Sequence, residues 1–165
     1  MKKLTLPAVV AGLAFAGTAA APAVAEERSC RGSIGAVTVD NLRVPQGASC
    51  TLSGTRVKGT VKVERSATLR ATNVRVVGNV QAENHKQVDI SRSAVGGSIQ
   101  MKQGGGSSLN TNTVGGDVQY FTNRGTITIR SNRIDGNLQC KENQPAPTGA
   151  HNVVQGNKED QCRRL

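Results

Sequence analysis

A repeat of 19 or 20 residues constrains this chain more than any other feature of its sequence. A short motif that begins with glycine and then alternates apolar with polar residues recurs at Gly59, Gly78, Gly97, Gly116 and Gly136. These glycines are 19, 19, 19 and 20 residues apart, Gly156 follows after another 20, and Asp40 stands 19 residues before Gly59. Self-similarity at such a short period is typical of solenoids, in which each repeat forms one coil and stacks on its neighbours.

Each repeat contains three short runs of alternating apolar residues, which predict three strands per coil. The second and fourth residues after the glycine are apolar in most units, and we expect both to point inward because neighbouring side chains on a strand face opposite ways. The residue between them must then point outward. This outward column contains Arg43, Lys62, Gln81, Gln100, Gln119 and Gln139.

The pattern predicts an all-β fold, a single-stranded right-handed parallel β-helix (solenoid) of about six coils of 19–20 residues with three short strands per coil. Right-handedness follows from the strong preference of parallel crossovers for that hand. We expect the glutamines to form a ladder of amides between coils, and Asn112, Asn132 and Asn152 to stack at a corner. The glycine column is expected to mark a corner with a positive φ. The first 20-residue unit is expected to hold its extra residue in a corner, and residues 145–149 (PAPTG) to replace the second strand of the last coil.

The first 25 residues have the pattern of a secretory signal peptide. Two lysines precede an apolar run from Leu4 to Ala16, and small residues follow up to Ala25. That run is too short for a membrane span. We therefore expect a secreted or envelope-associated mature protein with a cap segment at 26–39, coils at 40–155 and a cap tail at 156–165.

Four cysteines in a secreted chain predict two disulfides, for which three pairings are possible. Cys50 and Cys140 fall in coils about 24 Å apart along the rod, whereas a disulfide requires Cα atoms within about 7 Å. Cys30 should therefore pair with Cys50, and Cys140 with Cys162, each bridge tying a terminal segment over one end of the rod. The chain has no C-x-x-C motif and its two histidines fall in separate coils, so we predict no metal and no cofactor.

The motif V-x-G-[ND]-V-Q, as in residues 76–81 and 114–119, resembles secreted bacterial β-helix repeat proteins of unassigned function. The ending at 136–140, followed by PAPTG and residues 156–162, is similar to the same group. The resemblance implies a fold and secretion, but no activity. The repeat geometry is also loosely similar to bactofilins, which are β-helical and polymerise end to end. A signal peptide and two disulfide-tied ends depart from that pattern, and the capped ends are expected to prevent stacking, which favours a monomer.

One end of the rod is predicted to be basic, since residues 40–77 contain seven basic and two acidic residues. We expect Arg43 to lie over Lys62, and Arg56 over Arg75, one coil apart. Such stacked cations can hold an anionic envelope polymer, for example a teichoic acid or an acidic polysaccharide. The alternative, that these bases only keep the rod soluble, stays open. Nucleic acid is disfavoured as a partner because the aromatic residues that stack on bases are nearly absent.

A polysaccharide lyase or hydrolase of the β-helix type is the alternative function. Such enzymes require carboxylates that converge, for Ca²⁺ or for acid–base catalysis. The central acids Glu83, Asp89, Asp117 and Asp135 stand at different places in the repeat. No catalytic constellation is therefore predicted, and the sequence favours a non-catalytic module.

Overall fold

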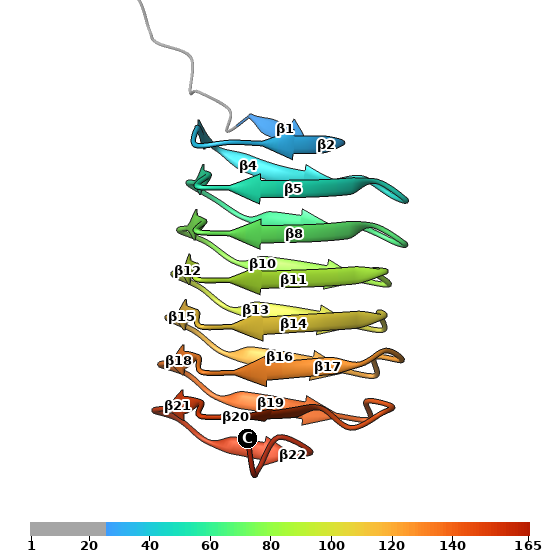
Figure 1. The fold of residues 1–165 in the computed structure, drawn as a ribbon, viewed down its shortest axis with the longest axis vertical. Helices are drawn as coiled ribbons and strands as arrows, with labels where there is room; N and C mark the ends of the chain where they lie inside the picture. Colours follow the sequence, from blue (N-terminus) through green and yellow to red (C-terminus); the bar gives the residue numbers. More distant parts are fainter. Residues whose placement is uncertain (1–25) are drawn as a thin grey trace, which may run out of the picture.

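The chain forms a parallel β-solenoid of about seven coils (Figure 1), described by a computed structural model for residues 26–165. The predicted signal peptide, residues 1–25, lies outside the described residues. Each coil contributes one strand to each of three parallel sheets, which we name A, B and C. In Figure 1 the front strands, such as β5, run to the left while those behind, such as β10, run to the right as the chain descends. The solenoid is therefore right-handed, as predicted.

The strands are short and recur in the same order in every coil. Sheet A contains β1 (Glu27–Ser29), β4 (Asn41–Val44), β7 (Val61–Val63), β10 (Val80–Glu83), β13 (Ile99–Lys102), β16 (Val118–Phe121), β19 (Leu138–Lys141) and β22 (Lys158–Asp160). Sheet B contains β2 (Gly32–Ile34), β5 (Ser49–Ser53), β8 (Thr68–Thr72), β11 (Gln87–Ser91), β14 (Gly106–Asn110), β17 (Ile127–Arg130) and β20 (Thr148–Ala150). Sheet C contains β3 (Thr38–Val39), β6 (Arg56–Val57), β9 (Arg75–Val76), β12 (Ala94–Val95), β15 (Thr113–Val114), β18 (Arg133–Ile134) and β21 (Val153–Val154).

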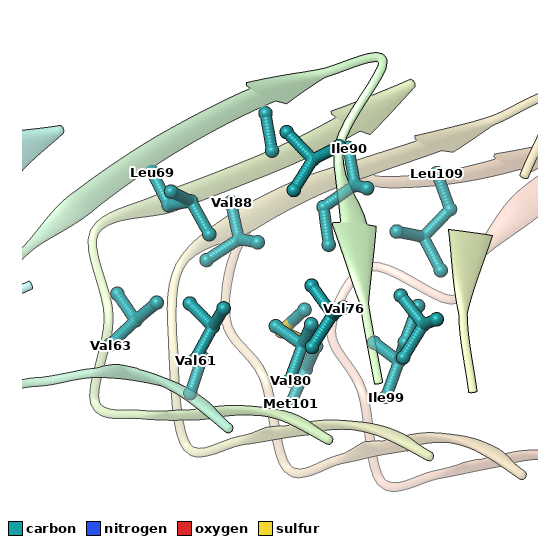
Figure 2. Close-up of a cluster of buried hydrophobic side chains, with 14 of the residues drawn as sticks. Val61, Val63, Leu69, Val76, Val80, Val88, Ile90, Ile99, Met101 and Leu109 are labelled. Atoms are coloured by element: carbon teal, nitrogen blue, oxygen red, sulfur yellow. The ribbon is translucent and has the colours of Figure 1, made fainter. Parts of the chain in front are cut away.

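Paired residues of neighbouring coils are one repeat length apart in the sequence, so equivalent residues stack on one another. Val61, Val80 and Ile99 are successive partners in sheet A, and all three are buried. Figure 2 shows such apolar side chains meeting inside the coil, from sheets on different sides of it. Near Asn123 the spacing changes: the Gly104 amide still bonds 19 residues on, but Ser107 pairs 20 residues on with Ile127. The predicted extra residue therefore lies in the corner between sheets A and B.

The structure has one coil more than the sequence indicated. Residues 26–39, expected to form a cap, instead form β1, β2 and β3, which pair in register with the next coil. That segment lacks the glycine motif, so the repeat did not reveal it.

The prediction that PAPTG replaces a strand was also wrong, because β20 begins at Thr148 and pairs with β17. At the other end the tail does cover the core: β22 is followed by a turn in which Cys162 is buried and Leu165 packs on the apolar cluster.

Both disulfides form as predicted. Cys30 bonds to Cys50, with Cα atoms 5.6 Å apart, and Cys140 bonds to Cys162, with Cα atoms 5.3 Å apart. Each bridge joins the first or last coil to its neighbour, at the points where stacking on one side ends. The bridges therefore restrain the coils that would otherwise fray most readily.

The predicted amide ladders are also confirmed. On the outside of sheet A the Nε2 of Gln81 donates to Gln100, Gln100 to Gln119 and Gln119 to Gln139, with distances of 3.4, 3.1 and 2.8 Å. Inside a corner, the Nδ2 of Asn112 donates to Asn132 at 3.0 Å, and Asn132 to Asn152 at 3.0 Å. The second ladder also satisfies buried backbone groups: the Asn112 amide donates to Asn132 Oδ1 at 3.0 Å, and Asn112 Nδ2 donates to the Ile90 carbonyl at 2.8 Å.

The role assigned to the glycine column was wrong. The positive φ values occur instead at residues of other corners, such as Asn73 (φ 55°) and Thr111 (φ 58°). The repeat glycines are required because the neighbouring coil passes too close for a side chain. A Cβ at Gly78 would lie 2.7 Å from the Gly59 carbonyl oxygen and 2.9 Å from its carbonyl carbon, both backbone atoms that cannot move aside.

We predict that Gly78→Ala lowers the free energy of unfolding by about 1–3 kcal/mol, the usual cost of overpacking, because the coils must move apart to admit the methyl group. Gly35→Ala is the matched control, since a Cβ there meets nothing within 4 Å. Urea unfolding followed by circular dichroism measures both variants. Equal stability of the two variants would contradict the close-approach explanation.

Candidate binding surface

The four basic residues expected to form one binding end lie on two different faces. Arg43 and Lys62 are register partners in sheet A, whereas Arg56 and Arg75 are register partners in sheet C. Each predicted pair is thus confirmed as a stack. The two pairs belong to separate sheets of the coil, so they form two surfaces rather than one.

Arg43 is engaged by carboxylates from both neighbouring coils. Its Nε lies 2.9 Å from Glu27 Oε1, and its Nη1 lies 3.3 Å from Glu64 Oε1. Partial burial works to raise the pKa of Glu64, but hydrogen bonds from the Gln46 amide and from Arg43 outweigh it and hold the pKa below its usual value. The ionised Glu64 therefore neutralises Arg43, which leaves little charge for an external anion.

Lys62 lines a groove of about 620 Å³ at the edge of sheet A. The groove carries charges of both signs, because Arg65 and Lys102 line it together with Glu64 and Glu83. Glutamine amides of the outer ladder form part of its wall. This surface presents mixed polar groups and no clear excess of positive potential.

Sheet C has a different electrostatic character at its N-terminal end. Arg56 and Arg75 are both exposed and lie one above the other, and neither forms an ion pair within residues 26–165. Other bases of these coils do: Lys58 Nζ lies 2.9 Å from Asp40 Oδ1, and Arg70 Nε lies 3.9 Å from Asp89 Oδ2. Within these coils Arg56 and Arg75 therefore form a stacked pair of exposed arginines without a carboxylate partner.

A shallow hollow of about 470 Å³ adjoins this pair of arginines, and sequence reasoning missed it. Arg75 lines the hollow together with Arg92, Thr111 and Thr113. Arg92 was not recognised because it stands at a corner, at the position that Asn73 occupies in the preceding coil. No other repeat has a lysine or an arginine at this position. One signal in the sequence could have revealed the hollow. Arg92 stands two residues before Ala94, and Ala94 is shorter than its register partners Arg75 and Thr113 in the outward column of sheet C.

The central carboxylates are dispersed: Glu83 lines the groove on sheet A, and the other three have local partners. Asp89 accepts a hydrogen bond from Gln87 Nε2, Asp117 Oδ1 accepts the Asn137 amide at 2.7 Å, and Asp135 lies 3.6 Å from Arg133. Within residues 26–165 no group of three or more His, Cys, Asp or Glu side chains is arranged to hold a metal ion. In the same residues no helix is long and apolar enough to cross a membrane.

His85 is buried in the corner between sheets A and B, with 3% of its surface exposed. Neither ring nitrogen has a hydrogen-bond partner among the described residues, and the ring fills the space that a side chain at Gly104 would occupy. Desolvation by this burial lowers the pKa of His85 from its ordinary value of 6.5 to about 4. At neutral pH the imidazole is therefore an uncharged filler of the corner, in the column that Asn123 and Asn143 occupy further along.

No family model, no curated protein and no solved structure matches this chain. Of the resemblance to secreted β-helix repeat proteins, the parallel solenoid of three sheets is supported by the structure, while no family is identified.

We predict that His85 makes the protein less stable in acid. The unfolded chain binds the proton at its ordinary pKa, the folded chain only near pH 4, so stability is complete above about pH 6.5 and falls as the pH drops toward 4. The loss is about 3 kcal/mol. Urea unfolding at pH 7 and at pH 4 measures it, with His85→Gln as the variant that cannot titrate. An unchanged pH dependence in His85→Gln would contradict the assignment.

Proposed function

We propose that this protein is a non-catalytic β-solenoid of the cell exterior or envelope, whose N-terminal coils contact an anionic polymer through sheet C. The observation that carries the proposal is the stack of Arg56 on Arg75 without an acid partner. Like charges placed directly opposite on neighbouring strands destabilise a sheet. Strands lie about 4.8 Å apart, so the two side chains start from neighbouring backbone positions, and an anion bound between them would relieve their repulsion.

The contrast with Arg43 supports a specific role for this face. Where Arg43 stacks near Lys62, the chain supplies Glu27 and Glu64 to compensate the charge. Within residues 26–165 no carboxylate forms such an ion pair with Arg56 or Arg75, whereas Arg133, further along the same column of sheet C, lies 3.6 Å from Asp135. An external polyanion completes this electrostatic arrangement, and a rigid sheet holds the guanidinium groups in the regular spacing that a linear polymer can follow.

The location outside the cytoplasm rests on the two disulfides and on the predicted signal peptide. Disulfides persist in oxidising compartments and are rare in the cytosol. Both bridges lie at ends of the solenoid, where a reduced chain would lose its restraint. Anionic polymers of the envelope are therefore the polyanions that such a protein meets first.

We predict that the oxidised protein binds teichoic acid and polygalacturonate at low salt, and that Arg56→Gln/Arg75→Gln weakens the binding about tenfold. Binding should also fall as salt screens the charges. Arg130→Gln/Arg133→Gln is the matched control, because it removes the same charge from exposed residues of later coils. Isothermal titration or co-sedimentation over a salt series measures all three proteins.

Three outcomes contradict the proposal. Absence of binding at low salt leaves the arginines as a solubility feature. Equal weakening by the two double variants means that net charge alone governs binding. Release of polymer fragments during incubation contradicts the non-catalytic assignment and favours the polysaccharide-active alternative.

A further inference from the structure

We propose that the hollow at Ala94 is a defined subsite for one phosphate group of a phosphodiester polymer, a step that rests on the proposed function and names its ligand chemistry. The hollow exists because the outward column of sheet C changes size along the rod. Arg75 and Thr113 are the register partners of Ala94 in the two adjoining coils. A short side chain between two longer ones leaves a depression whose floor is the Ala94 methyl group.

The lining of the hollow combines basic, hydroxyl and amide side chains with the apolar side chains of Val74 and Ala94. Arg75 borders it in its own sheet and Arg92 borders it from the corner between sheets B and C. Thr111, Thr113 and Asn73 complete the polar lining. The Thr111 hydroxyl already donates to Asn110 Oδ1 at 3.0 Å. Two planar guanidinium groups, the Thr113 hydroxyl and the Asn73 amide remain, and they suit an oxyanion with several acceptor oxygens, because paired arginines are the usual protein partners of phosphate.

The charge of the hollow is uncompensated. No acidic residue lines it, and neither Arg75 nor Arg92 makes an ion pair within the described part of the chain. The larger groove on sheet A differs in this respect, because Glu64 and Glu83 offset its lysines and arginine. The hollow is therefore a more favourable electrostatic environment for an anion than the groove on sheet A.

The frame under the hollow is held in place by buried hydrogen bonds. The Val74 amide donates to Ser93 Oγ at 3.0 Å, and the Ser93 amide donates to Asn112 Oδ1 at 3.0 Å. Ser93 Oγ in turn donates to the Ser91 carbonyl at 2.8 Å. The backbone that carries both arginines is thus set before a ligand arrives, so that binding has to order only the two side chains.

Inorganic phosphate and poly(glycerol phosphate) are the probes that test this subsite, with chloride at matched ionic strength as the reference. We expect phosphate to shift the backbone amide resonances of Ala94, Thr111 and Thr113 in a saturable titration of the full mature chain. Arg92→Gln should weaken phosphate binding about tenfold, the loss expected for one charge-assisted contact. Arg130→Gln removes the same charge elsewhere and should bind as the wild type does.

Ala94→Ile is the decisive variant, because it fills the hollow without changing the charge and places a good strand former on an outward position. It should abolish the phosphate-induced shifts, whereas Thr128→Ile, which adds bulk to the outer face of sheet B, should retain them. Folding of each variant is verified from its amide spectrum. Phosphate binding by Ala94→Ile at wild-type strength overturns the subsite.

The two polymer sources and the two proposals are separated by the same set of proteins. Shifts with poly(glycerol phosphate) and with phosphate, but not with polygalacturonate, assign the site to phosphodiesters. Polymer binding that depends on Arg56 and Arg75 but survives Ala94→Ile overturns the subsite and leaves the proposed function standing. Absence of both kinds of binding overturns both.

Discussion

Stacking in register is the constraint on which the whole structure depends, because it places every side chain against its own equivalent in the next coil. The consequence differs with the chemistry of the residue. An amide both donates and accepts, so Gln100 is satisfied by an identical neighbour on each side. A valine likewise packs on a valine, as Val61 does on Val80. An arginine gains nothing from an arginine, since both only donate and both are positive.

The same constraint explains the polarity of the outer ladder. Every amide in it donates toward the C-terminal end, and the last, Gln139, donates to Glu159 at 2.8 Å. Glu159 can only accept, so the ladder ends there. At the opposite end Lys62, which can only donate, is the register partner of Gln81. The direction of the row thus matches an acceptor at its C-terminal end and a donor at its N-terminal end.

Much of this architecture could be predicted, because the period of 19 or 20 residues determines which residues meet. The columns, both disulfide pairings and the asparagine stack follow from that period alone. Other features could not be predicted, and three of them share one cause. Residues 26–39 form a coil without the motif, Gly78 is required by a backbone in the next coil, and Glu27 reaches Arg43 from the unpredicted coil. Each depends on distances between atoms of neighbouring coils, which cannot be derived from the positions of residues in the sequence.

The candidate surface follows from the same difference between columns of stacked residues. In some columns the stacked side chains meet one another's hydrogen-bonding or charge requirements, and in others they do not. In sheet A, Arg43 is paired with carboxylates from both neighbouring coils, and the glutamine amides bond to one another in a directed ladder. Sheet C places Arg56 on Arg75 and then interrupts the column with Ala94, which opens a hollow beside Arg92. Selection for stability alone favours threonine in such a column, as at Thr113, since its side chain suits a strand and carries no charge. Two uncompensated arginines beside a small residue are therefore the features on which the proposed binding surface rests.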